Sequence, residues 1–234
     1  MSEYMNGNNF KYNVCAIVPL YNEADMAGKT INSLLEINSI NKIVAVDDGS
    51  TDSTWKIISS IDSIIKLKHQ KNMGKAEAIK DAIKICPADI YVFVDGDIGE
   101  SAVNISHIID EVINDNCDMC IAGFHESDLA GGFGLLRSFS KFAVYFFTGR
   151  HFPCPLSGQR AVKSKVIHDP RVRLYHGYGL ETGMLIDSIL AGYSIGLKYV
   201  DLNHNVTYRN LKGFMHRAKQ FADVASVFVS KLLG

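Results

Sequence analysis

The sequence lacks three features that would place it in other classes of protein. Basic residues show no excess, since 24 Lys and Arg stand against 25 Asp and Glu, which argues against a nucleic-acid binder that works by neutralising phosphates. No window reaches about 18 consecutive apolar residues, so no membrane-spanning helix is expected. The five cysteines are odd in number and scattered, which favours a reducing compartment over a disulfide framework. We therefore expect a cytoplasmic protein.

Two short segments could suggest processing or redox chemistry, and neither interpretation is favoured. The polar, Asn-rich start of the chain lacks the apolar core of a signal peptide, and residues 1–12 are predicted to be a flexible N-terminus. Cys117 and Cys120 have the spacing of a redox motif, but an apolar run from Ile121 follows them as a predicted strand. We interpret the two cysteines as buried core thiols.

The sequence does contain a regular alternation of strands and helices. At 234 residues, with 47% hydrophobic residues, the chain can bury a large core as an α/β domain. Apolar runs of strand length alternate with helical periodicity, which indicates βαβ units and a mainly parallel, Rossmann-like sheet flanked by helices. The predicted strands are 14–18, 43–46, 64–67, 90–94 and 196–200, and the predicted helices include 26–37, 75–85, 135–147 and 181–190.

One predicted strand ends in two carboxylates separated by a glycine, Asp95-Gly96-Asp97. Side chains two apart on an extended backbone lie on the same side, so Asp95 and Asp97 can hold one Mg²⁺ or Mn²⁺ ion. Water and substrate phosphate would complete the shell of that ion. Gly96 leaves room for a ligand backbone or a phosphate. Acidic turns after strands are common, so the motif alone is weak.

Two other predicted strands also end in polar residues, at 19–23 and 47–50. Ligands of open α/β sheets bind outside the carboxyl ends of the parallel strands, so these loops and 95–97 would converge on one crevice. Turn and cap residues would explain each loop separately. They would not explain why the carboxylates gather at strand exits and not at strand entries.

Three other phosphate-site patterns fit less well. The stretch 27–30 resembles the end of a P-loop, but the chain has Glu23 where that motif needs glycine. No G-x-G-x-x-G follows the first strand, which argues against a dinucleotide-binding fingerprint. The acidic pair 47–48 with Asp95 and Lys75 could belong to a phospho-receiver domain, but such a domain would account for only part of this length.

Four motifs, VPLYNE, VDDGSTD, NMGK and DGD, occur in order at 18–23, 46–52, 72–75 and 95–97. Together they resemble family 2 nucleotide-sugar glycosyltransferases of the GT-A fold. The second half resembles the dolichol-phosphate-mannose synthase and glucosyl-3-phosphoglycerate synthase relatives, through RS at 137–138, LSGQR at 156–160 and GYGLETG at 177–183. The resemblance implies a nucleotide-sugar-binding half at 13–125 and an acceptor-binding half at 126–234, which ends in an amphipathic helix.

The resemblance implies a metal-dependent enzyme that moves a sugar from a nucleoside diphosphate, by preference UDP, to an acceptor hydroxyl or phosphate. Inversion is the default, and retention stays open because 177–187 also resembles the phosphoglycerate group. Glu23 would lie near the ribose, Asp48 would accept from the base N–H, and Lys75 would add positive charge beside the diphosphate. The implied donor-binding residues are Pro19, Tyr21, Glu23, Asp48, Ser50, Gly74, Lys75, Asp95 and Gly96.

Asp97 and Glu181 are the predicted catalytic residues. In the resemblance, Asp95 and Asp97 form the Asp-x-Asp metal element, with Asp97 the more direct ligand of a cation that bridges the diphosphate. His204 would be a third metal ligand, although a lone histidine is also commonly structural. Glu181, at the start of a predicted helix, is suited to act as general base, unless it only compensates the helix dipole.

Arg137 and Arg160 are predicted phosphate contacts through their planar donor forks, or else partners of surface carboxylates. The segments 135–147 and 211–233 combine broad apolar stripes with basic residues, which fits a core or homodimer face or a peripheral contact with the inner face of the membrane. A lipid contact would favour a polyprenyl phosphate acceptor, and otherwise a small soluble acceptor is expected. The alternative from another class is a non-catalytic sugar-nucleotide sensor or assembly subunit.

Overall fold

The structure is a computed structural model that describes residues 12–123, 134–177, 179–202 and 211–233. Its centre is a seven-stranded sheet in the order β3-β2-β1-β4-β6-β5-β7. Every pairing is parallel except those of β6, which runs antiparallel to β4 and β5. The strands are β1 (Val14–Leu20), β2 (Lys42–Asp47), β3 (Ile65–Lys68), β4 (Ile90–Phe93), β5 (Met119–Gly123), β6 (Arg160–Lys163) and β7 (Ile195–Tyr199).

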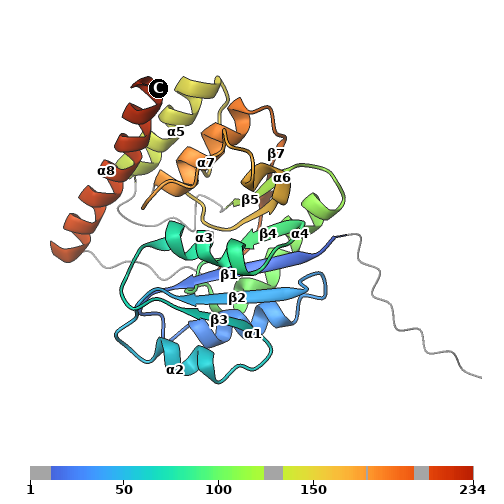
Figure 1. The fold of residues 1–234 in the computed structure, drawn as a ribbon. Helices are drawn as coiled ribbons and strands as arrows, with labels where there is room; N and C mark the ends of the chain where they lie inside the picture. Colours follow the sequence, from blue (N-terminus) through green and yellow to red (C-terminus); the bar gives the residue numbers. More distant parts are fainter. Residues whose placement is uncertain (1–11, 124–133, 178, 203–210, 234) are drawn as a thin grey trace, which may run out of the picture.

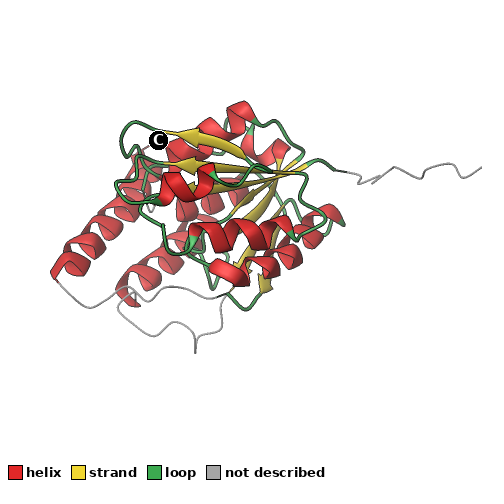
Figure 2. Cartoon of the chain, turned by 90° about the horizontal axis from the view of Figure 1, so that it is seen from below, coloured by secondary structure: helices red, strands yellow, loops and turns green. Residues whose placement is uncertain are grey.

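Helices cover both faces of this sheet (Figures 1 and 2). Strand β1 shows why, because its residues are buried in alternation on the two sides: Val14, Ala16 and Val18 join one apolar core, and Cys15 and Ile17 join the other. The first core includes residues of α1 (Ala27–Leu35), the 3₁₀ helix η1 (Gly99–Ile105) and α4 (Ser106–Ile113). The second includes residues of α3 (Lys75–Ile85), α5 (Gly134–Thr148) and α7 (Gly179–Leu190).

Three further helices complete the fold: α2 (Thr54–Ser59), α6 (Ser164–Ile167) and the long α8 (Leu211–Leu233). Helix α8 contacts α7 and α5, and these three helices form one side of the molecule (Figure 1). A buried ion pair between Lys231 of α8 and Asp187 of α7 ties the C-terminal helix to the rest. Within the described ranges, no helix combines the length and the apolar character needed to cross a membrane.

The predicted α/β architecture is confirmed, with its mainly parallel sheet between helices. Helix α3 has the predicted bounds, and β1 and β2 extend the predicted strands by one or two residues. All five cysteines are buried and free, as interpreted for Cys117 and Cys120. A seven-stranded sheet with an antiparallel strand is not a phospho-receiver domain, so that alternative is excluded.

Candidate active site

The carboxyl ends of the parallel strands bring the predicted loops to one edge of the sheet. The register pairs Leu20 of β1 with Asp47 of β2, and Ile17 of β1 with Phe93 of β4. The segments that follow these strands therefore leave the sheet on the same side. This edge, which we call the carboxyl edge, carries the loops at 21–26, 48–53 and 94–98.

The loops after β1 and β2 are joined by hydrogen bonds. Asn22, which has a positive φ of 56°, donates its backbone N–H to the Ser50 hydroxyl over 3.0 Å, and its side-chain oxygen accepts from the Thr51 N–H over 2.8 Å. The Ser50 N–H in turn donates to the Asp47 carboxylate over 3.0 Å. Ser50 therefore connects two strand exits. Tyr21, which precedes Asn22, is exposed.

Asp48 organises the entrance to helix α3. It is buried, and its Oδ1 accepts from the Met73 N–H over 2.8 Å and lies 2.7 Å from Nδ1 of His69. Its Oδ2 accepts from the Gly74 N–H over 2.7 Å, at a glycine whose φ of 96° other residues rarely adopt. These bonds use three of about four acceptor positions on the carboxylate. The contact of Asp48 with a nucleotide base stays a prediction.

Lys75 joins two carboxylates that are far apart in the sequence. Its Nζ lies 2.6 Å from Oδ1 of Asp95, after β4, and 2.9 Å from Oε1 of Glu181, in the first turn of α7. Burial would lower the pKa of Lys75, but Asp95 and Glu181 outweigh burial and raise the pKa above its ordinary value. Glu181 is only 6% exposed. The lysine thus holds Glu181 beside the Asp95-Gly96-Asp97 turn.

Gly158 contributes to this cluster although no role was predicted for it. A Cβ atom on Gly158 would lie 2.4 Å from Oδ2 of Asp95 and 2.6 Å from Nζ of Lys75. The backbone before β6 therefore presses directly against the ion pair, and any larger residue would push the ends of these two side chains aside. The signal in the sequence was the glycine of LSGQR, a motif used for the resemblance alone.

Gly96 is also required by close packing. A Cβ atom at this position would lie 2.2 Å from Cδ2 of Leu20 and 3.6 Å from Cγ of Glu23. The Gly96 carbonyl accepts a hydrogen bond from the Thr30 hydroxyl over 2.8 Å, which anchors the turn to α1. Packing is therefore sufficient to explain this glycine, and the room that it was predicted to leave for a phosphate stays a prediction.

Arg160 lies in the interior and is only 1% exposed. Its Nε donates to the Ser157 carbonyl over 2.9 Å, and its Nη2 donates to the Pro155 carbonyl over 3.0 Å. Burial lowers the pKa of Arg160 to about 10, against the influence of Glu181 and Asp95 nearby. The guanidinium thus shapes the backbone of 155–157 and adds positive charge behind the cluster. The structure does not bring it to the surface, and its contact with a substrate phosphate stays a prediction.

The pKa of Glu23 is sensitive to the charges around it at the carboxyl edge. Burial, and then the nearby charges of Asp97 and Asp95, raise the pKa of Glu23 to about 7. The raised pKa therefore reflects the burial of Glu23 first and the negative charge of neighbouring carboxylates second. Hard oxygen donors with excess negative charge fit a divalent cation such as Mg²⁺ or Mn²⁺.

The described residues contain no group of three or more His, Cys, Asp or Glu side chains arranged to hold a metal ion. A cation held by Asp95 and Asp97 alone, with the rest of its shell supplied by substrate and water, stays a prediction. The predicted third ligand, His204, lies outside the described residues. Arg137 is half-buried on α5, and its phosphate contact also stays a prediction.

Comparison with known families identifies the chain. The model of the family described as Glycosyl transferase family 2 matches residues 15–169. The chain belongs to glycosyl transferase family 2. The matched region runs from within β1 through β6 and includes the DGD turn at the carboxyl edge of this glycosyltransferase.

Relatives and solved structures extend the likeness beyond the matched region. A 27% identical, uncharacterized protein of Methanocaldococcus jannaschii aligns over 231 residues, which cover 88% of this chain and 96% of the relative. UDP-N-acetylglucosamine–dolichyl-phosphate N-acetylglucosaminyltransferase of Methanococcus voltae is 32% identical over 120 residues, which cover 43% of this chain and 47% of that enzyme.

The glycosyltransferase has the fold of a solved synthase. Glucosyl-3-phosphoglycerate synthase of Mycobacterium tuberculosis, in a complex with Mn²⁺, UDP and phosphoglyceric acid, superposes with a TM-score of 0.75 at 19% identity. The superposition covers 94% of this chain and 78% of the synthase chain. The predicted GT-A fold and the resemblance to this synthase are therefore confirmed.

Proposed function

We propose that the protein transfers a sugar from a nucleoside diphosphate, in first place UDP, to an acceptor hydroxyl or phosphate, and that a divalent cation supports the transfer. The observation that carries the proposal is the cluster of Lys75, Asp95 and Glu181 at the carboxyl edge, beside the mutually repelling Glu23 and Asp97. A structural network would neutralise its own charges. This cluster keeps an excess of carboxylates, which suits a cation and a diphosphate together.

Each residue of the cluster has a role in this proposal. Asp95 and Asp97 would hold Mg²⁺ or Mn²⁺. When bound, the cation would supply positive charge that stabilises the departing nucleoside diphosphate. Lys75 keeps Glu181 in place and adds a second positive charge near the diphosphate.

Glu181 would accept the proton of the acceptor hydroxyl as general base in an inverting transfer. Its placement in the first turn of α7, fixed by the Lys75 ammonium, supports that role because a base must hold one orientation toward its substrate. In the retaining alternative Glu181 would only orient the acceptor. The two mechanisms differ in the anomeric configuration of the product, which proton NMR of the product measures directly.

The acceptor class is the next part of the proposal. The Methanococcus voltae relative acts on dolichyl phosphate, and the solved synthase was crystallised with phosphoglyceric acid. Both molecules carry a phosphate. We therefore propose an acceptor with a phosphate group, either a polyprenyl phosphate or a small soluble compound, with Arg137 as a candidate contact.

Calorimetry of UDP binding tests the metal role. UDP should bind the wild-type protein with Mn²⁺ present, and Asp97→Ala should lose most of that affinity. Asp62→Ala is the matched control, because the Asp62 side chain is fully exposed on the loop before β3. Metal-independent UDP binding that is unchanged in Asp97→Ala would contradict the proposed metal site.

A second measurement separates an enzyme from the non-catalytic alternative. An active enzyme should release UDP slowly from a UDP-sugar in the presence of Mn²⁺, and Glu181→Gln should lower transfer to an acceptor. A sensor or assembly subunit would bind the donor, release no UDP and be indifferent to Glu181→Gln. Thermal shifts with UDP-, GDP- and dTDP-sugars in the presence of Mn²⁺ identify the donor for these assays.

A further inference from the structure

Helices α5 and α8 expose a concentration of large apolar side chains. Among the described residues, 14 large hydrophobic side chains are exposed, and seven of them lie on these two helices. Leu135 is 77% exposed and Leu233 is 83% exposed, so these leucines gain little by burial within the chain. We call this set the α5–α8 face; it consists of Leu135, Phe142, Tyr145, Phe146, Val229, Leu232 and Leu233.

Helices α5 and α8 lie side by side (Figure 1), and aromatic ring contacts join them. The Phe139 ring centroid lies 4.9 Å from that of Phe221, and the Phe146 centroid lies 5.3 Å from that of Phe228. The step from Phe139 to Phe146 along α5 is matched by an equal step from Phe221 to Phe228 along α8, so the two helices run in the same direction. Leu135, Phe142 and Phe146 are spaced at helical intervals and share one stripe of α5.

The charge of the two helices differs from that of the rest of the chain. Their sequences contain six basic residues and one acidic residue, whereas the whole chain has 24 basic and 25 acidic residues. One of the six, Lys231, is compensated by its buried ion pair with Asp187 of α7, which leaves five. The one acid, Asp223, lies against Gly177, where a Cβ atom would meet its carboxylate. The apolar α5–α8 face is therefore set in a segment with an excess of positive charge and almost no negative charge.

We propose that the α5–α8 face docks on an anionic membrane surface. Aromatic and aliphatic side chains flanked by basic residues match the boundary between lipid headgroups and acyl chains, where each lysine or arginine adds attraction. A symmetric contact between two copies fits less well, because it would bring together two copies of helices in which basic residues outnumber acidic ones. The proposal goes beyond the transfer reaction and does not rest on it.

The position of the face gives docking a consequence for the site. Helix α7 contacts both α5 and α8, and its first turn carries Glu181. At that end of α7, the Cβ position of Gly179 lies 2.5 Å from Cγ2 of Val227 in α8, so the Val227 side chain packs directly against the backbone of α7. Docking through α5 and α8 would thus hold the candidate base close to the lipid surface.

Sedimentation with lipid vesicles tests the proposal on the full chain. The wild-type protein should bind vesicles of phosphatidylcholine with phosphatidylglycerol about tenfold more tightly than vesicles of phosphatidylcholine alone, and salt should weaken this binding. Leu135→Ser combined with Leu233→Ser should lower the binding about tenfold, because both side chains are largely exposed and their loss leaves the core intact. Lys141→Glu should lower binding to anionic vesicles and leave binding to neutral vesicles unchanged.

Matched controls separate docking from other causes. Leu35→Ser on α1 and Val103→Ser on η1 also change exposed apolar residues, and both variants should bind vesicles like the wild type. Asp97→Ala should bind vesicles normally even where UDP binding is lost, so the two proposals can fail separately. Equal binding to both lipid mixtures would overturn the proposal. So would absence of vesicle binding together with a dimer, seen by analytical ultracentrifugation, that the double leucine variant dissociates.

Discussion

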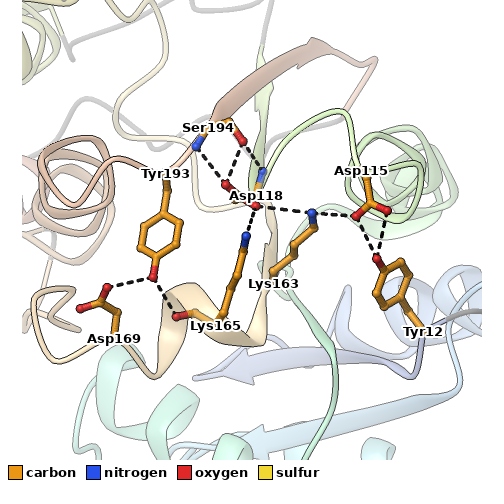
Figure 3. A network of polar contacts seen from close by, with 8 residues as sticks. All are labelled: Tyr12, Asp115, Asp118, Lys163, Lys165, Asp169, Tyr193 and Ser194. Atoms are coloured by element: carbon orange, nitrogen blue, oxygen red, sulfur yellow. Dashed lines mark hydrogen bonds and ion pairs between the residues drawn. The ribbon is translucent and has the colours of Figure 1, made fainter.

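The carboxylates at the amino ends of the parallel strands and those at the carboxyl ends differ in how closely they are paired with cations. At the amino ends of the parallel strands, Asp115 and Asp118 lie in a network with Lys163 and Lys165 (Figure 3). Lys163 Nζ lies 2.9 Å from Asp115 and 3.4 Å from Asp118, and Lys165 Nζ lies 2.7 Å from Asp118. We call this network the amino edge, and both of its carboxylates, Asp115 and Asp118, have a cation within reach. At the carboxyl edge, several carboxylates share Lys75 and the interior Arg160.

The pKa shifts show the same contrast. Burial would raise the pKa of Asp118, but hydrogen bonds from Lys165 and Ser194 outweigh burial and lower the pKa to about 2. Burial and neighbouring carboxylates instead raise the pKa of Glu23 to about 7. The amino edge is therefore a structural network that neutralises itself, and the carboxyl edge is an acidic site that suits an added cation.

Gly158→Ala is the change with the largest expected effect, and it acts on the carboxyl edge alone. The added Cβ would lie 2.4 Å from Asp95 and 2.6 Å from Lys75, so one or both side chains must move. A displacement of about 1 Å at a reacting centre can lower a rate about 100-fold, which we expect for UDP release from the donor. Gly134→Ala is the control, since its Cβ would meet nothing within 4 Å. Equal rates for the two variants would contradict the importance of this packing.

Lys75→Ala should destabilise the protein by about 2 kcal/mol, because it leaves Asp95 and the buried Glu181 without their shared cation. Added Mn²⁺ should restore part of this loss if it binds the same carboxylates. Lys80→Ala, which removes an ion pair with Glu77 on the same helix, should change stability by about 0.5 kcal/mol or less. Urea unfolding at pH 7 measures the free energy of unfolding of both variants. Similar losses in the two would show that the ion pairs of Lys75 contribute no more to stability than an exposed surface ion pair.

Asp118→Asn tests the amino edge and should cost about 1 to 2 kcal/mol at pH 7. The folded pKa of about 2 lies below the ordinary value of 3.8, so the stabilisation is present above pH 4 and is lost as the pH falls toward 2. The difference between wild type and variant should therefore shrink over that range in thermal melts. Added Mn²⁺ should not change the stability difference between wild type and Asp118→Asn, whereas it should restore part of the stability that Lys75→Ala loses.

Much of the carboxyl edge could be predicted because it depends on local sequence. Apolar runs that end in Asp95-Gly96-Asp97 or in the polar 47–50 segment specify strand exits, and parallel pairing gathers such exits at one edge. Helix α3 was predicted with its observed bounds, since its alanines and the glycine before it are local signals. Four ordered motifs were also sufficient to identify the family that the comparison later confirmed.

Contacts between distant segments could not be predicted in the same way. Lys75 and Glu181 are 106 residues apart, and their ion pair depends on where the tertiary fold places the first turn of α7 relative to that of α3. Strand β6 has only four residues, and its antiparallel direction follows from pairing with β4 and β5. The interior position of Arg160 is a consequence of that strand. An exposed or a buried arginine looks the same in the sequence.

Glu23→Gln should have the smallest effect and the opposite sign. The pKa of Glu23 is about 7 in the folded protein and 4.5 as its ordinary value, so ionisation costs stability as the pH rises from 4.5 to 7. Glutamine removes that cost, and after allowance for solvent screening the variant should be about 1 kcal/mol more stable at pH 8 and unchanged at pH 4. Asp118→Asn at pH 8 should instead be less stable than wild type. If Glu23→Gln also loses stability at pH 8, the carboxyl edge is as well neutralised as the amino edge, and the contrast on which the cation site depends disappears.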